Sequence, residues 1–110
     1  MIKVLWFLKR ADGLSLEEFR EWWLAHAQDV LASQSPHLAR YTVNIRVADK
    51  DDLPGSPALG CEWDGVAEQW FATREDFAAA YDRPQSTTRS DTLAHTSAFT
   101  RLVVDETPLC

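Results

Sequence analysis

Residues 15–26 read SLEEFREWWLAH, and this stretch predicts a capped amphipathic helix with a histidine on its buried side. Ser15 and Glu18 have the spacing of a capping box, in which each side chain accepts a hydrogen bond from the other residue's backbone N–H. His26 lies about 20° from Phe19 on the helical wheel, so it points into aromatic surroundings rather than into water. The apolar stripe on this side consists of Leu16, Phe19, Trp23, Ala27 and Val30.

A histidine in this position supports two interpretations. Its imidazole changes charge near neutral pH, so a partly desolvated ring beside indoles is able to give and take protons. A core histidine that only bonds a backbone carbonyl fits the same spacing. The sequence therefore makes His26 a candidate general acid or base and leaves the structural interpretation open.

Strands surround this helix in a recognisable order. The helix ends before Pro36, because the residue before a proline avoids the helical region. Alternation of apolar and polar residues marks the second strand, and Thr73 with Asp76 marks the start of a second helix. Residues 85–95 fit a weak helix or a loop, and residues 48–64 fit a lid, a binding loop or a disordered segment. The predicted strands are residues 2–9, 38–47, 65–71 and 98–104, and the predicted helices are residues 16–33 and 73–81.

The order strand, helix, strand, strand, helix, strand predicts a ferredoxin-like α+β fold, with an antiparallel sheet and two helices on one face. We expect a single domain over residues 1–110. Both faces of the first strand are apolar, so the face without helices requires a partner surface. A second copy related by a two-fold axis is the simplest partner, and we predict a homodimer.

Composition excludes several classes of partner. The chain has 11 basic and 17 acidic residues and a net charge of −6, which argues against nucleic acid or an anionic membrane as the main partner. The apolar residues 1–8 are too short to span a membrane and lack the flanks of a signal peptide, so we expect a cytoplasmic protein. Neither the two cysteines, Cys61 and Cys110, nor the three histidines have metal-site spacing, and no metal or cofactor is predicted.

Glu68 is a second candidate for proton transfer. It shares a strand face with Trp70, where a carboxylate must be paired, solvated or protonated. If Glu68 meets His26 across a pocket, the two form an acid–base couple. The structural alternative is an ion pair with an arginine of a neighbouring strand, which is Arg40, Arg46 or Arg101.

Other polar and aromatic residues are candidates for substrate contacts. Asn44 and Tyr41 face opposite sides of a regular strand, so at most one of them lines a given pocket. We favour Asn44 for binding an enolate or carbonyl oxygen and keep Tyr41 as the alternate. Trp22, beside His26, is a candidate pocket wall. The remaining candidates for substrate binding are Trp6, Trp23, Trp70 and His95.

Five segments together resemble the EthD family of dimeric α+β-barrel proteins. They are residues 3–10 (KVLWFLKR), 13–19 (GLSLEEF), 23–27 (WLAHA), 38–44 (LARYTVN) and 64–71 (DGVAEQWF). The resemblance covers residues 2–81 in register. Within the family, the step from Phe19 to His26 and the run EQWFA at residues 68–72 are most similar to methylmuconolactone methylisomerase.

The resemblance implies proton transfer without metal or cofactor in a pocket between helices and sheet. His26 occupies the place of the family's helix histidine, with Glu68 and either Tyr41 or Asn44 as companions. We therefore expect an isomerase or lyase that acts on a small lactone or a cyclic, aromatic-derived intermediate. The alternatives are a polyketide cyclase or dehydratase, and a non-catalytic dimeric protein that holds an aromatic ligand or supports a partner oxygenase. The tryptophans fit the binding protein equally well.

Overall fold

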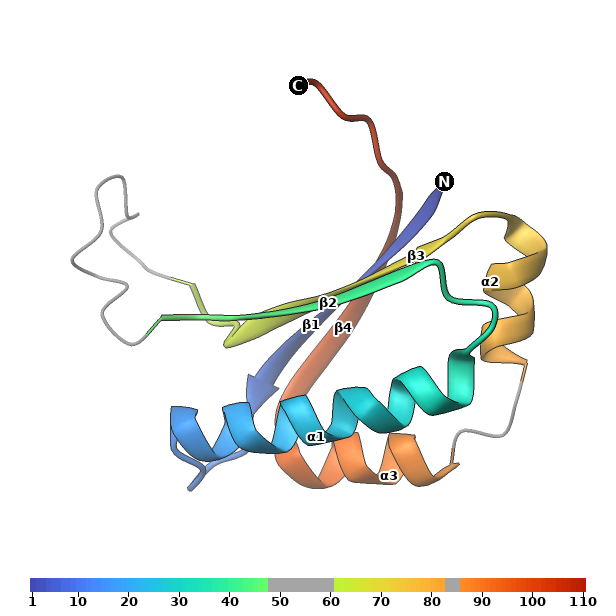
Figure 1. The fold of residues 1–110 in the computed structure, drawn as a ribbon. Helices are drawn as coiled ribbons and strands as arrows, with labels where there is room; N and C mark the ends of the chain where they lie inside the picture. The colour runs from blue at the N-terminus through green and yellow to red at the C-terminus, as the bar shows by residue number, and fades with distance from the viewer. Residues whose placement is uncertain (48–60, 83–85) are drawn as a thin grey trace.

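The computed structural model describes residues 1–47, 61–82 and 86–110, which form one antiparallel sheet with helices on one side (Figure 1). The sheet order is β2-β3-β1-β4, so β1 lies between β3 and β4. This arrangement confirms the ferredoxin-like α+β fold. In chain order the elements are β1 (Ile2–Arg10), α1 (Leu16–Gln34), β2 (Arg40–Ile45), β3 (Gly65–Phe71), α2 (Arg74–Tyr81), α3 (Ser86–His95) and β4 (Thr96–Asp105).

The segment that the sequence left undecided is the helix α3. The helical layer therefore contains α3 beside α1, in addition to α2 (Figure 1). The other predicted elements occur with ends that differ by at most two residues, the usual uncertainty of helix and strand boundaries. Residues 48–60 of the predicted long loop lie outside the described residues.

The first helix follows its predicted pattern closely. Glu18 N donates to Ser15 Oγ at 3.0 Å, and Ser15 N donates to Glu18 Oε1 at 2.9 Å, which confirms the capping box. Phe19 and Trp23 are fully buried, and His26 is only 8% exposed. The predicted buried side of α1 is therefore the side that packs on the sheet.

The register of the strands sorts their side chains onto two faces. Residues directly paired in an antiparallel sheet point to the same side, and Trp6, Ala67 and Val43 form one such row beneath the helices. We call the opposite side, over which no described helix lies, the open face. Its rows contain Arg40, Trp70, Lys3 and Val104, then Thr42, Glu68, Leu5 and Leu102, and then Asn44, Val66, Phe7 and Thr100.

Gly65 allows α1 to approach the sheet. A Cβ atom at this position would lie 2.6 Å from Trp23 Cζ3 and 2.3 Å from the backbone oxygen of Asn44. Real side chains do not occupy such distances, so the fully buried indole of Trp23 requires a glycine beneath it. This contact sets the distance between the helix that carries His26 and the strand β3.

We expect the Gly65→Ala variant to lose about 3 kcal/mol of unfolding free energy, because the added methyl group forces the helix and the strand apart. Gly13→Ala is the matched control. Gly13 has φ +90° and open space around it. Its variant should therefore lose only about 1 kcal/mol of unfolding free energy, from the unfavourable backbone conformation of alanine. Urea unfolding of both variants measures the difference, and equal losses would contradict the role given to Gly65.

Candidate functional site

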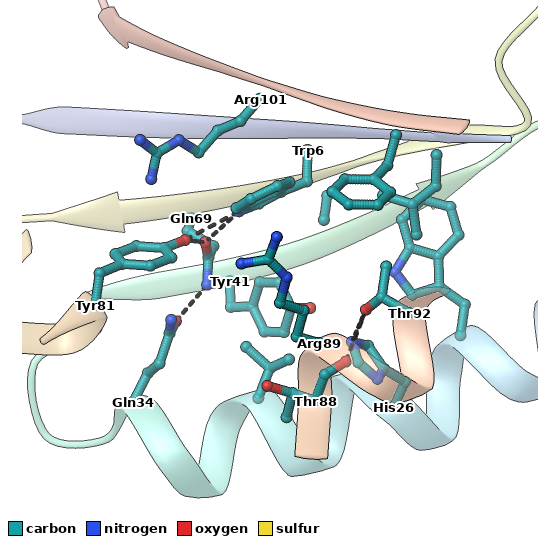
Figure 2. Close-up of a pocket in the computed structure, with 15 residues that line it drawn as sticks. Trp6, His26, Gln34, Tyr41, Gln69, Tyr81, Thr88, Arg89, Thr92 and Arg101 are labelled. Carbon is teal, nitrogen blue, oxygen red and sulfur yellow. Dashed lines mark hydrogen bonds between the residues drawn. The ribbon is translucent and has the colours of Figure 1, made fainter. Parts of the chain in front are cut away.

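The helix-covered face holds a cavity of about 690 Å³ between the sheet and the helices (Figure 2). A cavity of this volume suits a small molecule. Its aromatic walls are Trp6, Trp23, Tyr41, Tyr81 and Phe99. Its polar lining consists of His26, Gln34, Gln69, Thr88, Arg89, Thr92 and Arg101.

His26 is held in place by α3. Its Nδ1 lies 2.8 Å from Asp91 Oδ2, while Trp22 Nε1 donates to Asp91 Oδ1 at 3.0 Å. The imidazole stacks on the Trp22 ring with centroids 4.9 Å apart, and His95 stacks on the same indole at 4.8 Å. His95 Nδ1 also donates to the backbone oxygen of Asp91 at 2.8 Å. One carboxylate therefore fixes two side chains of α1 against α3.

The charge of Asp91 determines the tautomer of His26. Partial burial raises the pKa of Asp91, but the hydrogen bonds from Trp22 and His26 outweigh it and hold that pKa below its ordinary value. An ionised carboxylate only accepts hydrogen bonds, so His26 Nδ1 carries a proton and donates it to Asp91. His26 Nε2 is then the nitrogen that is able to exchange protons with a bound molecule.

Thr92 matches both protonation states of this nitrogen. Its hydroxyl oxygen lies 3.3 Å from His26 Nε2 and 2.9 Å from the backbone oxygen of Thr88 (Figure 2). A hydroxyl has one proton to donate. When His26 is neutral, Thr92 is able to donate to Nε2. When His26 is protonated, Nε2–H donates to Thr92, which donates in turn to Thr88. His26 therefore finds a partner before and after a proton transfer.

A second polar cluster lies at the other end of the cavity, where Gln69 joins three elements (Figure 2). Trp6 Nε1 donates to Gln69 Oε1 at 3.2 Å and to the Tyr81 hydroxyl oxygen at 3.0 Å. The Tyr81 hydroxyl donates to Gln69 Oε1, and Gln69 Nε2 donates to Gln34 Oε1. Burial raises the pKa of Tyr81 and that of Tyr41. Both phenols therefore stay protonated at neutral pH.

The structure brings some of the predicted site residues together. His26, Trp6, Trp23 and Tyr41 line the cavity, so Tyr41 rather than Asn44 is the residue of this strand that reaches it. Trp22 and His95 stack behind His26 rather than lining the cavity. The sequence missed Asp91, Gln69, Tyr81, Arg89 and Arg101. The row that joins Tyr41 to Gln69 would have revealed Gln69 once the register was known.

Glu68 does not meet His26, and the predicted acid–base couple is wrong. Its row places it on the open face, so the sheet separates the two side chains. Glu68 forms an ion pair with Lys3 at 3.0 Å and accepts from Thr42 Oγ1 at 3.0 Å. Partial burial raises the pKa of Glu68, and these partners together lower it below its ordinary value. The partner is therefore Lys3 and none of the three arginines proposed from the sequence.

Asn44 and Trp70 also lie on the open face, away from the cavity. Asn44 Nδ2 donates to the backbone oxygen of Val66 at 3.0 Å and to Glu68 at 3.3 Å. Trp70 Nε1 donates to Glu106 at 3.1 Å, and the charged groups of Lys3 and Arg40 each lie 4.7 Å from its ring centroid. These two side chains therefore belong to the surface where a partner is expected, and neither lines the pocket.

Histidine, cysteine, aspartate and glutamate side chains nowhere gather in a group of three or more that would hold a metal ion within residues 1–47, 61–82 and 86–110. None of the described helices is long and apolar enough to cross a membrane.

Comparison with known proteins relates the chain to one family. The family model of the EthD domain matches residues 11–98, and no curated protein matches the sequence. An EthD-like protein from Ralstonia eutropha is 20% identical with a TM-score of 0.69, over 94% of this chain and 89% of its own. SnoaB, a cofactor-independent oxygenase from Streptomyces nogalater, is 17% identical with a TM-score of 0.63, over 98% and 94%. A dimeric protein of unknown function from Bacteroides fragilis is 12% identical with a TM-score of 0.66, over 96% and 95%.

We expect the Asp91→Asn variant to be about 1 kcal/mol less stable than the parent at neutral pH, because it loses two charge-assisted hydrogen bonds at a partly exposed site. The pKa of Asp91 is lowered in the folded protein, so this advantage is present above its ordinary value of 3.8 and disappears as the pH falls through the lower folded value.

Urea unfolding at neutral pH and at successively lower pH values measures the difference between parent and variant. Asp29→Asn, at an exposed position of α1, is the control and should be as stable as the parent at each pH. A difference between parent and Asp91→Asn that stays constant down to the lowest pH would contradict the ionised Asp91–His26 pair.

Proposed function

The chain belongs to the EthD family, and on this premise we propose that it is a cofactor-independent enzyme that transfers protons on a small cyclic substrate. The observation that carries the proposal is the pair of His26 and Asp91. The carboxylate holds His26 Nδ1–H at 2.8 Å, and the imidazole lines a cavity of about 690 Å³. A buried base that is fixed in one tautomer and faces an aromatic cavity is the minimum that such catalysis requires.

In this proposal, His26 Nε2 removes a proton from the carbon beside a lactone carbonyl. The electron pair of the C–H bond moves to the carbonyl oxygen and forms an enolate, and Asp91 stabilises the imidazolium. An isomerase returns the same proton to a different carbon. A lyase instead expels a leaving group from the neighbouring carbon. Neither outcome requires an oxidant, because the summed oxidation level of the substrate's carbons stays the same.

Tyr41 is the proposed donor to the enolate oxygen. It lines the cavity, and its raised pKa keeps the phenol protonated. No described residue forms a hydrogen bond with its hydroxyl group, whereas Tyr81 already bonds Trp6 and Gln69. A neutral donor aimed at a developing negative charge in an aromatic cavity stabilises the transition state more than the ground state.

The substrate class that we propose is a small lactone or a cyclic, aromatic-derived intermediate. Planar rings suit a cavity whose walls are Trp6, Trp23, Tyr41 and Phe99. SnoaB, which has a similar fold, is a cofactor-independent oxygenase, and cofactor-free chemistry on this fold is consistent with the proposal.

We also propose that the open face forms a homodimer. Leu102 is 52% exposed there, beside the partly buried Leu5 in the same row. Phe7 on this face packs on Trp63 with centroids 6.0 Å apart. A contiguous apolar surface of this kind is typical of an interface, and the neighbour from Bacteroides fragilis is described as dimeric.

Turnover of substituted muconolactones, followed by ultraviolet absorbance with and without EDTA, tests the enzyme proposal. We expect His26→Ala to lower kcat at least about a hundredfold, because general base catalysis contributes at least that much. His37→Ala is the matched control, because His37 follows α1, outside the cavity, and this variant should keep its activity.

Other outcomes of this assay separate the alternatives. Activity that EDTA abolishes would overturn the cofactor-free mechanism. Binding without turnover, weakened by Trp23→Ala and unchanged by His26→Ala, would favour the non-catalytic binding protein. Consumption of O₂ during turnover would move the chemistry to an oxygenase, because proton transfer consumes none.

The dimer is tested by light scattering during size-exclusion chromatography. We expect the parent to run as a dimer at micromolar concentration and the Leu102→Asp variant as a monomer, because a carboxylate at the centre of an apolar interface is costly to desolvate. Leu24→Asp, at a position of α1 that is also exposed, is the control and should remain dimeric. A monomeric parent would defeat the proposal.

A further inference from the structure

The charge of the cavity differs in sign from that of the chain. The protein carries a net charge of −6, yet two arginines and no carboxylate line the cavity among the described residues. The arginines are Arg89 on α3 and Arg101 on β4. A positive lining in an acidic protein raises the local concentration of anions and favours an anionic ligand.

Arg101 is held in position by aromatic rings rather than by an ion pair. Its Cζ atom lies 5.6 Å from the ring centroid of Trp6 and 5.5 Å from that of Tyr81 (Figure 2). It also lies 5.8 Å from the ring centroid of Phe77. No carboxylate of the described residues forms a salt bridge with it, and no described oxygen accepts a hydrogen bond from it. The planar guanidinium is therefore supported by its neighbours and keeps its five N–H donors for a ligand.

Arg89 is the second arginine of the lining and lies on α3, the helix that also carries Thr92. It likewise has no carboxylate or hydrogen-bond acceptor among the described residues, and its side chain reaches into the cavity between Tyr41 and Thr92 (Figure 2). Arg89 and Thr92 are three residues apart on α3, so they share one face of the helix. Because Thr92 contacts His26 Nε2 at 3.3 Å, Arg89 lies on the face of α3 that is turned toward the candidate base.

We propose that Arg89 and Arg101 form a carboxylate-binding subsite, so that the substrate is a cyclic compound that carries a carboxylate side chain. This inference rests on the proposed function and specifies its substrate class. A guanidinium binds a carboxylate through two parallel hydrogen bonds and thereby fixes its orientation. The subsite holds the acidic end of the substrate, and the ring lies among the aromatic walls with a carbon directed to His26.

The two arginines therefore determine specificity rather than perform chemistry. Both arginine side chains are exposed, so replacing either leaves the buried core unchanged. A bound carboxylate shields them from solvent and strengthens their attraction for it. Esters and amides of the same ring lack the charge, so the subsite discriminates against them.

Isothermal titration calorimetry with pairs of acids and methyl esters tests this inference. The probes are muconolactone, benzoate and phenylacetate, each beside its methyl ester, at low salt and at millimolar concentration. We expect at least one acid to bind about tenfold more tightly than its ester. Arg101→Met and Arg89→Met should each reduce this preference, and the double variant should abolish it. Arg20→Met, at an exposed position of α1 outside the cavity, is the control and should keep it.

Several results would overturn the subsite. These are equal affinity for acid and ester, a preference that survives in the double variant, and no binding of any acid at millimolar concentration. Arg101→Lys and Arg89→Lys should restore part of the preference, because they keep the charge and lose the planar pair of donors. A preference that salt does not weaken would also contradict an ionic subsite.

The same titrations separate this inference from the proposed function. His26→Ala should keep the preference for acids, because His26 acts on the ring carbon and not on the carboxylate. Acid preference in a protein without turnover would refute the enzyme and keep the subsite. Turnover of esters as fast as acids, with equal binding of both, would refute the subsite and keep the enzyme.

Discussion

The carboxylate of Asp91 joins α3 to α1 and thereby places one wall of the cavity. Apolar burial contributes little to this attachment, since Leu93 of α3 remains 56% exposed. The indole N–H of Trp22 and the imidazole N–H of His26 both donate to the Asp91 carboxylate. The group that orients the candidate base therefore also positions α3, which forms one wall of the cavity. Structure and chemistry therefore depend on one interaction at this point.

The two faces of the sheet carry different kinds of side chain. Its helix-covered face carries a cavity lined by His26, by neutral donors and by two arginines, and its open face carries apolar residues around the Lys3–Glu68 ion pair. Since neighbouring residues of a strand alternate between these faces, a shift of one position along the strand moves a side chain from the cavity to the open face. Glu68 and Gln69 are adjacent in sequence, yet one joins the open face and the other the polar cluster of the cavity.

The sequence predicted the parts of the fold that follow from local patterns. The capping box, the apolar stripe of α1 and the alternation of β2 are properties of neighbouring residues, and they predicted His26 as a buried residue correctly. The helix α3 contains mostly small polar residues, and tertiary contacts through Asp91 hold it, so periodicity could not reveal it. Both faces of β3 carry large side chains, with Trp70 on one and Phe71 on the other, and nothing local indicates which face the helices cover. This ambiguity placed Glu68 beside His26 in the prediction.

The position of β1 in the sheet has a consequence for how the chain folds. This strand precedes all others in the sequence, but it pairs with β3 and β4, and its register with β4 joins Ile2 to Asp105. Contacts between such distant residues require a large loss of chain entropy before they form, which slows folding relative to helical proteins of similar size. During synthesis, the apolar run from Val4 to Leu8 therefore stays unpaired until the ribosome has made β3 and β4. The local structure of α1, with its capped first turn, forms earlier, while the central strand is exposed to aggregation until the last strand arrives.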